Sequence, residues 1–134
     1  MIATKENKIE IVKLLFNPWI PLIPLDVNLQ TTDEFRKMTA LMIACERERV
    51  EIVKLLLERK DLNVNLQNKG GDTALVLACL LSNTEIVKIL LEKGANPHIK
   101  NKEGETAIQK AVEYYGEEGA EIIKLLLDYC YEDH

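Results

Sequence analysis

The sequence lacks the features that membrane-spanning, secreted and nucleic-acid-binding proteins require. Its longest apolar run, around Leu75–Leu81, is far shorter than the roughly 18–20 residues that cross a bilayer as a helix. Met1–Lys8 has no secretory-signal pattern. The formal net charge of −5 over 134 residues disfavours a nucleic-acid backbone as the main partner, because phosphates bind basic surfaces. We therefore expect a cytoplasmic protein that binds neither membrane nor nucleic acid.

Cysteine, histidine and catalytic motifs are also scarce. The chain has three cysteines and two histidines, and no two cysteines form a Cys-x-x-Cys pair, so the clustered ligands of a zinc site are missing. GxSxG, P-loop and HExxH motifs are absent. The acid pair Glu117–Glu118 lacks the ligand spacing of a calcium loop. We therefore expect no metal, no cofactor and no enzymatic activity, with Cys45 and Cys79 as small core residues.

One phrase recurs four times along the chain. Each copy has the form Glu-Ile-Val-Lys-Leu-Leu-Leu or a close variant, and successive glutamates are 41, 34 and 36 residues apart: Glu10, Glu51, Glu85 and Glu121. A period of this size is typical of stacked supersecondary units, because one unit alone cannot bury its apolar face. In the second copy, Val53, Leu56 and Leu57 share a helical face while Lys54 stays in water. Each copy therefore predicts an amphipathic helix.

A second, shorter phrase precedes the last three of these helices. It begins at Thr39, Thr73 and Thr106, and the first two copies are almost wholly apolar. This pattern predicts a buried helix with threonine as its N-cap. A polar, turn-rich segment such as 63–72 joins one helix pair to the next. The predicted helix pairs are therefore 39–57, 73–91 and 106–127.

These units resemble the ankyrin repeat, in which a β-turn precedes two helices and the first helix opens with Thr-Pro-Leu-His-x-Ala. Thr73, Leu75 and Ala78 fit this opening, although alanine and valine replace the proline and the histidine. Gly104 fits a loop glycine of the family. The tetratricopeptide repeat expects a Trp-x-x-Leu-Gly opening, which the sequence lacks; its single tryptophan is Trp19. The resemblance implies an all-α solenoid of helix-turn-helix units with β-turn or hairpin loops.

We expect one domain, 1–134, with repeats at roughly 1–34, 35–68, 69–101 and 102–134. The first repeat is truncated, either as a degenerate cap or because the chain is part of a longer array. The last repeat is expected to end the array. Lys110 holds the position that is Leu77 in the preceding repeat, and a lysine there suits a repeat with nothing stacked beyond it. The proline-rich insertion 17–25 covers apolar surface, contacts a partner as a loop, or acts as a PxxP ligand.

The resemblance implies that a protein partner is bound by the loop tips and by the exposed face of each first helix. The loop candidates are Phe35, Arg36, Lys69, Asp72, Lys102 and Glu105. The helix candidates are Glu46, Arg47, Leu80, Leu81, Glu113 and Tyr114. Because Glu46 and Arg47 are charged, packing does not require leucine at the equivalent Leu80 and Leu81. These leucines predict an apolar contact site beside Tyr114, or they are covered by the longer turn of the last unit.

Three functions follow from this pattern. The leading one is a non-catalytic module that presents a concave surface to a protein partner. The second is a targeting or regulatory fragment of a larger enzyme or host-directed effector. The third is a structural role, in which the chain, otherwise a monomer, stacks end to end on another copy through its open first repeat. The 13 isoleucines, 13 lysines and nine asparagines suit an AT-rich genome, as in microbes whose ankyrin proteins are delivered into a host cell.

Overall fold

The computed structural model describes residues 27–32 and 36–131, with the backbone alone at 117, 118 and 131. Within these residues the chain forms three pairs of α-helices and no β-strand. The pairs are α2 (Ala40–Glu46) with α3 (Val50–Leu57), α4 (Ala74–Leu80) with α5 (Thr84–Glu92), and α6 (Ala107–Tyr115) with α7 (Ala120–Tyr131). The predicted helix pairs are therefore present. The truncated first repeat and the insertion 17–25 lie outside the described residues.

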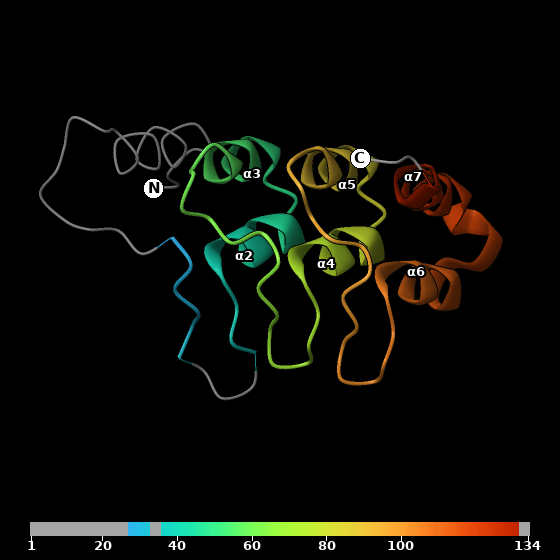
Figure 1. Ribbon diagram of the computed structural model, residues 1–134, viewed down its shortest axis with the longest axis horizontal. Coiled ribbons are helices and arrows are strands. Elements are labelled where there is room, and N and C mark those ends of the chain that lie inside the picture. Colours follow the sequence, from blue (N-terminus) through green and yellow to red (C-terminus); the bar gives the residue numbers. More distant parts are fainter. Residues whose placement is uncertain (1–26, 33–35, 132–134) are drawn as a thin grey trace, which may run out of the picture.

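The helices form two layers (Figure 1). α2, α4 and α6 lie in one layer, α3, α5 and α7 lie in the other, and the long loops project from the first layer on one side. Each helix packs against its equivalent in the next pair, so that α2 contacts α4, α4 contacts α6, α3 contacts α5 and α5 contacts α7. This arrangement confirms the predicted all-α solenoid with hairpin loops.

The first helix of each pair begins at the predicted threonine. The Thr39 hydroxyl accepts a hydrogen bond from the Met42 amide at 3.2 Å. Thr73 and Thr106 do the same for the amides three residues onward, each at 3.4 Å. These bonds satisfy amides that have no partner inside the helix. The hydroxyls therefore cap their helices, as the sequence predicts.

The core lies between the two layers. Val53, Leu56 and Leu57 are buried, while Lys54 is exposed, which confirms the predicted face of α3. Cys45 and Cys79, at equivalent positions in consecutive repeats, are buried and unpaired as disulfides. Burial disfavours the thiolate and raises the pKa of each thiol to about 12.

The last pair departs from the others in its turn and its length. A short 3₁₀ helix, Gly116–Gly119, joins α6 to α7. α7 continues to Tyr131, so the predicted end at residue 127 is wrong. The prediction stops where the repeated phrase stops, at Leu127, but residues 128–131 contain neither glycine nor proline and continue the helix.

Consecutive loops are joined by side-chain amides that repeat with the period of the fold. The Asn28 Oδ1 atom accepts from the Asn63 amide at 2.6 Å, and the equivalent Asn65 accepts from the Asn96 amide at 2.9 Å. The side-chain amides of Gln30 and Gln67 donate to the next loop, at the carbonyls of Gln67 and Lys100, at 2.8 and 3.0 Å. These bonds hold the loops in register.

Candidate functional site

Three side chains occupy one row across the first layer of helices. Arg47, Leu81 and Tyr114 each follow their capping threonine by eight residues, and they lie on or directly after α2, α4 and α6. All three are exposed, Leu81 at 40% and Tyr114 at 69% of their surface. We call this set the recognition row. It places a cation, an aliphatic side chain and an aromatic ring on three adjacent helices.

The two leucines that end the α4 segment have different surroundings. Leu80 is half-buried and packs against the core, whereas Leu81 faces water. The Tyr115 hydroxyl donates a hydrogen bond to the Leu80 carbonyl. Tyr115 also contacts Tyr114 edge to face, with ring centroids 4.8 Å apart. Tyr115, at the end of α6, is thus fastened against α4, while Tyr114 and Leu81 are exposed at equivalent positions of adjacent helices.

A pocket of about 300 Å³ adjoins the recognition row at Arg47. It brings together the predicted residues Arg36, Glu46 and Arg47, and a 2.5 Å ion pair joins Arg36 to Glu46. Three residues of the lining were not predicted from the sequence: Thr31, Met38 and Ile43. The sequence alone could have indicated Ile43 as a lining residue, because it holds the same repeat position as Leu77 and Lys110, which the repeat comparison already distinguishes. Phe35, the remaining candidate of this loop, lies outside the described residues.

Some loop candidates serve the fold itself. The Lys102 amide donates to the Gly70 carbonyl at 3.1 Å, and the Lys69 amide donates to the Arg36 carbonyl at 2.9 Å. The Asp72 carboxylate accepts from the Asn101 side chain of the next loop at 3.1 Å. The lysine side chains are exposed. The tips therefore offer lysine ammonium groups, while Asp72 joins two repeats.

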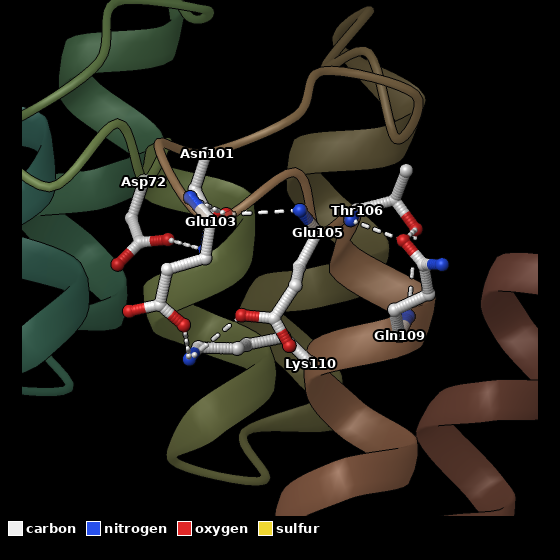
Figure 2. A network of polar contacts seen from close by, with 7 residues as sticks. All are labelled: Asp72, Asn101, Glu103, Glu105, Thr106, Gln109 and Lys110. Atoms are coloured by element: carbon white, nitrogen blue, oxygen red, sulfur yellow. Dashed lines mark hydrogen bonds and ion pairs between the residues drawn. The ribbon is translucent and has the colours of Figure 1, made fainter.

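Lys110 organises the acidic side of the last loop (Figure 2). Its ammonium lies 3.3 Å from Glu105 and 3.9 Å from Glu103. Hydrogen bonding with Glu113, then with Glu103, and contact with Lys110 lower the pKa of Glu105 to about 2. The hydrogen bond with Glu105 and the negative charge of Glu105 in turn raise the pKa of Glu113. Two predicted site residues, Glu105 and Glu113, therefore belong to one cluster, in which Lys110 is engaged with its own loop.

The part of the chain that the structure describes was predicted to hold neither a metal site nor a membrane span. No group of three or more histidine, cysteine or acidic side chains there could hold a metal ion. None of the helices described is both long and apolar enough to cross a bilayer. His98 is exposed on its loop, and its amide donates to the Asn96 side chain at 2.9 Å.

Comparison with known proteins gives a consistent result. The family model for ankyrin repeats (3 copies) matches residues 1–101 and 61–134. A protein of Fowlpox virus (strain NVSL), described as a putative ankyrin repeat protein, is 37% identical over 129 residues, which are 96% of this chain and 36% of the relative. The human transient receptor potential cation channel subfamily A member 1 is 37% identical over 121 residues, 90% of this chain and 10% of the channel.

A solved structure shares both sequence and fold. The crystal structure of the ankyrin repeat protein EF0377 has a TM-score of 0.62 and 38% identity, over 68% of this chain and 47% of that one. The chain thus spans about a third and a tenth of the lengths of the two curated relatives. Because the family model covers the whole sequence and the repeats stack as helix pairs joined by hairpin loops, the chain belongs to the ankyrin repeat family.

Proposed function

We propose that the chain is a non-catalytic module that binds a protein partner across the recognition row and the adjoining loops. The observation that carries this proposal is the exposure of Leu81 and Tyr114. Most large apolar side chains of the described repeats are buried or half-buried in the stack. Tyrosine and arginine, found here at the two ends of the row, are enriched at the energetic centres of protein interfaces.

The chemistry of the row indicates what kind of partner fits it. An apolar side chain of the partner would rest on Leu81 and the Tyr114 ring. A carboxylate would approach Arg47 and the loop lysines Lys69 and Lys102, since these cations are exposed. Arg36 and Glu46, which line the pocket, are further proposed contacts, and so are Asp72, Leu80, Glu105 and Glu113. Phe35, a proposed contact from the sequence, lies outside the described residues.

The test compares two leucines of similar exposure on different surfaces. Leu81 is 40% exposed on the row, and Leu127 is 37% exposed on α7. Leu81→Glu should remove the proteins that the wild-type chain captures from a lysate, whereas Leu127→Glu should retain them. A charge in a desolvated contact costs several kcal/mol only when the partner is bound, so the melting temperature should stay nearly unchanged. A large fall in the melting temperature of Leu81→Glu would assign this side chain to the core and leave the loop tips as the binding site.

A second proposal is that this module regulates or targets a larger protein. It is favoured by the size of the two curated relatives, of which the chain spans only 36% and 10%. The sequence of the complete gene tests it: coding sequence for a further domain supports a regulatory role, and its absence excludes one within the same chain.

We also propose that the protein acts inside a cell, in a host cell if it shares the setting of its viral relative. Buried, reduced thiols such as Cys45 and Cys79 are usual for intracellular proteins. Expression of a tagged chain in cultured cells followed by fractionation tests this: recovery in the culture medium would contradict it.

A further inference from the structure

Loop and helix side chains share five equivalent positions in each helix pair that the structure describes. Counted from the capping threonine, these positions lie three and one residues before it and four, seven and eight residues after it. In the second repeat all five line the pocket: Arg36, Met38, Ile43, Glu46 and Arg47. In the third repeat they are Gly70, Asp72, Leu77, Leu80 and Leu81, and in the last repeat Glu103, Glu105, Lys110, Glu113 and Tyr114. We call these positions together the inner face.

The charge of the inner face changes sign along the stack. In the second repeat two arginines stand against one glutamate, a formal charge of +1, and in the third repeat Asp72 gives −1. In the last repeat three glutamates stand against one lysine, a formal charge of −2. Including the adjacent loop position, which is Phe35, Lys69 and Lys102 in the three repeats, leaves sums of +1, 0 and −1. The change of sign therefore remains.

An aliphatic centre separates the two charged ends. Leu81 is 40% exposed, and Leu77 and Leu80 are half-buried, although α6 packs against α4. These positions thus stay accessible when another repeat follows, so their accessibility does not depend on where the stack ends. The loop residue opposite the leucines is Gly70, which has no side chain to cover them.

The inner face lies where the loops approach the first layer of helices. Arg36 on its loop lies 2.5 Å from Glu46 on α2, and Glu105 on its loop lies 3.3 Å from Lys110 on α6 (Figure 2). The loops project from this layer (Figure 1), so a second folded copy would bring its own projecting loops into the same space. A single segment of chain laid across α2, α4 and α6 fits better.

We propose that the inner face binds a segment of a partner protein in one orientation, with acidic residues over α2, an apolar residue on Leu77, Leu80 and Leu81, and lysine or arginine over α6. The reverse orientation brings like charges together at both ends, which disfavours it. This inference rests on the proposed function, because the recognition row is part of the inner face, and it adds the polarity of the partner segment.

The test uses three synthetic peptides of about 12 residues that share an apolar centre and differ only in charge. The dipolar peptide has glutamates in one half and lysines in the other, the second peptide has only glutamates, and the third has only lysines. Each half extends about 9 Å as a helix and about 20 Å as an extended chain. In either conformation it reaches the neighbouring helix, about 8–10 Å away.

Fluorescence anisotropy at low salt should show that the dipolar peptide binds the wild-type chain at least tenfold more tightly than either of the others. The preference should shrink in about 1 M salt, where the Debye length falls to about 3 Å. Arg47→Glu should weaken binding of the dipolar peptide by about tenfold or more, and Glu103→Lys should also weaken it, because each brings like charges together. The matched controls Lys88→Glu and Glu92→Lys, at exposed sites on α5, should bind like the wild type.

A spin label on the peptide tests the orientation without any variant of the chain. A nitroxide at the acidic end of the dipolar peptide should broaden the amide NMR signals of α2 more than those of α6, and a nitroxide at the basic end should do the reverse. Equal broadening from both ends, equal affinities for the three peptides, or no measurable binding of the dipolar peptide would overturn the inference.

The capture experiment with Leu81→Glu decides the proposed function separately, so the two failures are distinguishable. Capture that depends on Leu81, together with equal affinities for the three peptides, would keep the binding surface and remove its polarity. Sedimentation of the chain alone as a dimer that Arg47→Glu dissociates would assign the inner face to a second copy and would also overturn the inference.

Discussion

Replacing Gly71 with alanine should disrupt the register of two neighbouring loops. Gly71 has a φ of +84°, and a Cβ atom there would lie 2.7 Å from the Lys102 amide nitrogen and 2.9 Å from the Asn101 Cα atom. Both are backbone atoms, and the Lys102 amide is bonded to the Gly70 carbonyl. They cannot move aside without separating the loops. The nearby repeat therefore makes alanine costly here beyond its effect on the backbone.

Gly104 is the matched control for this substitution. It occupies the same repeat position with a φ of +80°, but nothing lies within 4 Å of the position that a Cβ atom would take there. Lys37, also equivalent, has a φ of 51°, so a residue with a side chain is tolerated in the left-handed region. The conformation costs alanine about 1–2 kcal/mol at either glycine. Overpacking against the next loop adds about 1–3 kcal/mol at Gly71 only.

Urea denaturation followed by circular dichroism measures both variants. We expect Gly104→Ala to lower the free energy of unfolding by about 1–2 kcal/mol. Gly71→Ala should lower it by about 2–5 kcal/mol, the sum of the backbone and overpacking costs. The slope of the free energy with urea should be unchanged in both if the compactness of each state is retained. Equal losses for the two variants would show that the approach of the neighbouring loop contributes nothing, and would refute the reasoning.

Three further predictions concern the core, the thiols and the acidic cluster. Leu90→Ala should lower the free energy of unfolding by about 2–5 kcal/mol in the same urea assay, because the side chain is fully buried. In native protein treated with an alkylating reagent, mass spectrometry should find Cys130 modified before Cys79, since Cys130 is partly exposed and Cys79 is buried with a pKa raised to about 12; the reverse order would contradict the packing. Carboxyl NMR should find Glu105 titrating with a pKa of about 2 and Glu113 with a pKa above its ordinary range. Ionised Glu105 therefore stabilises the fold above the unfolded pKa of about 4.3, and this contribution is lost as the pH falls toward about 2.

The sequence by itself determined the helix pairs, their caps and the inner faces. Thr73 and Val53 show why. A capping hydroxyl acts within one turn of its own helix, and a helical face is read from residues three and four apart. Both are local properties, so they repeat visibly with the period of the chain. The length of α7 was mispredicted, because the repeated phrase on which the prediction rests stops at Leu127, whereas residues 128–131 continue the helix.

The tertiary structure decided which of the candidate site residues are accessible. Leu80 and Leu81 are the same residue type side by side, yet Leu80 packs against the core and Leu81 is exposed. α6 packs against α4 here, and Tyr115 bonds to the Leu80 carbonyl. Asp72 and Glu105 appeared equivalent as loop acids. Asp72 bonds to Asn101 of the next loop, 29 positions away in the sequence. Glu105 bonds instead to Lys110 on the helix that follows it.

Equivalent positions in successive repeats show the same limit. Val112 and Cys79 are both apolar and hold the same place in their repeats, so the sequence pattern assigns both to the core. Cys79 is 0% exposed because α6 packs against its helix, whereas Val112 on α6 is 50% exposed among the described residues. Periodicity reports which side of a helix is apolar, whereas burial depends on what is packed against that side. The presence of that neighbour is a property of the assembled stack.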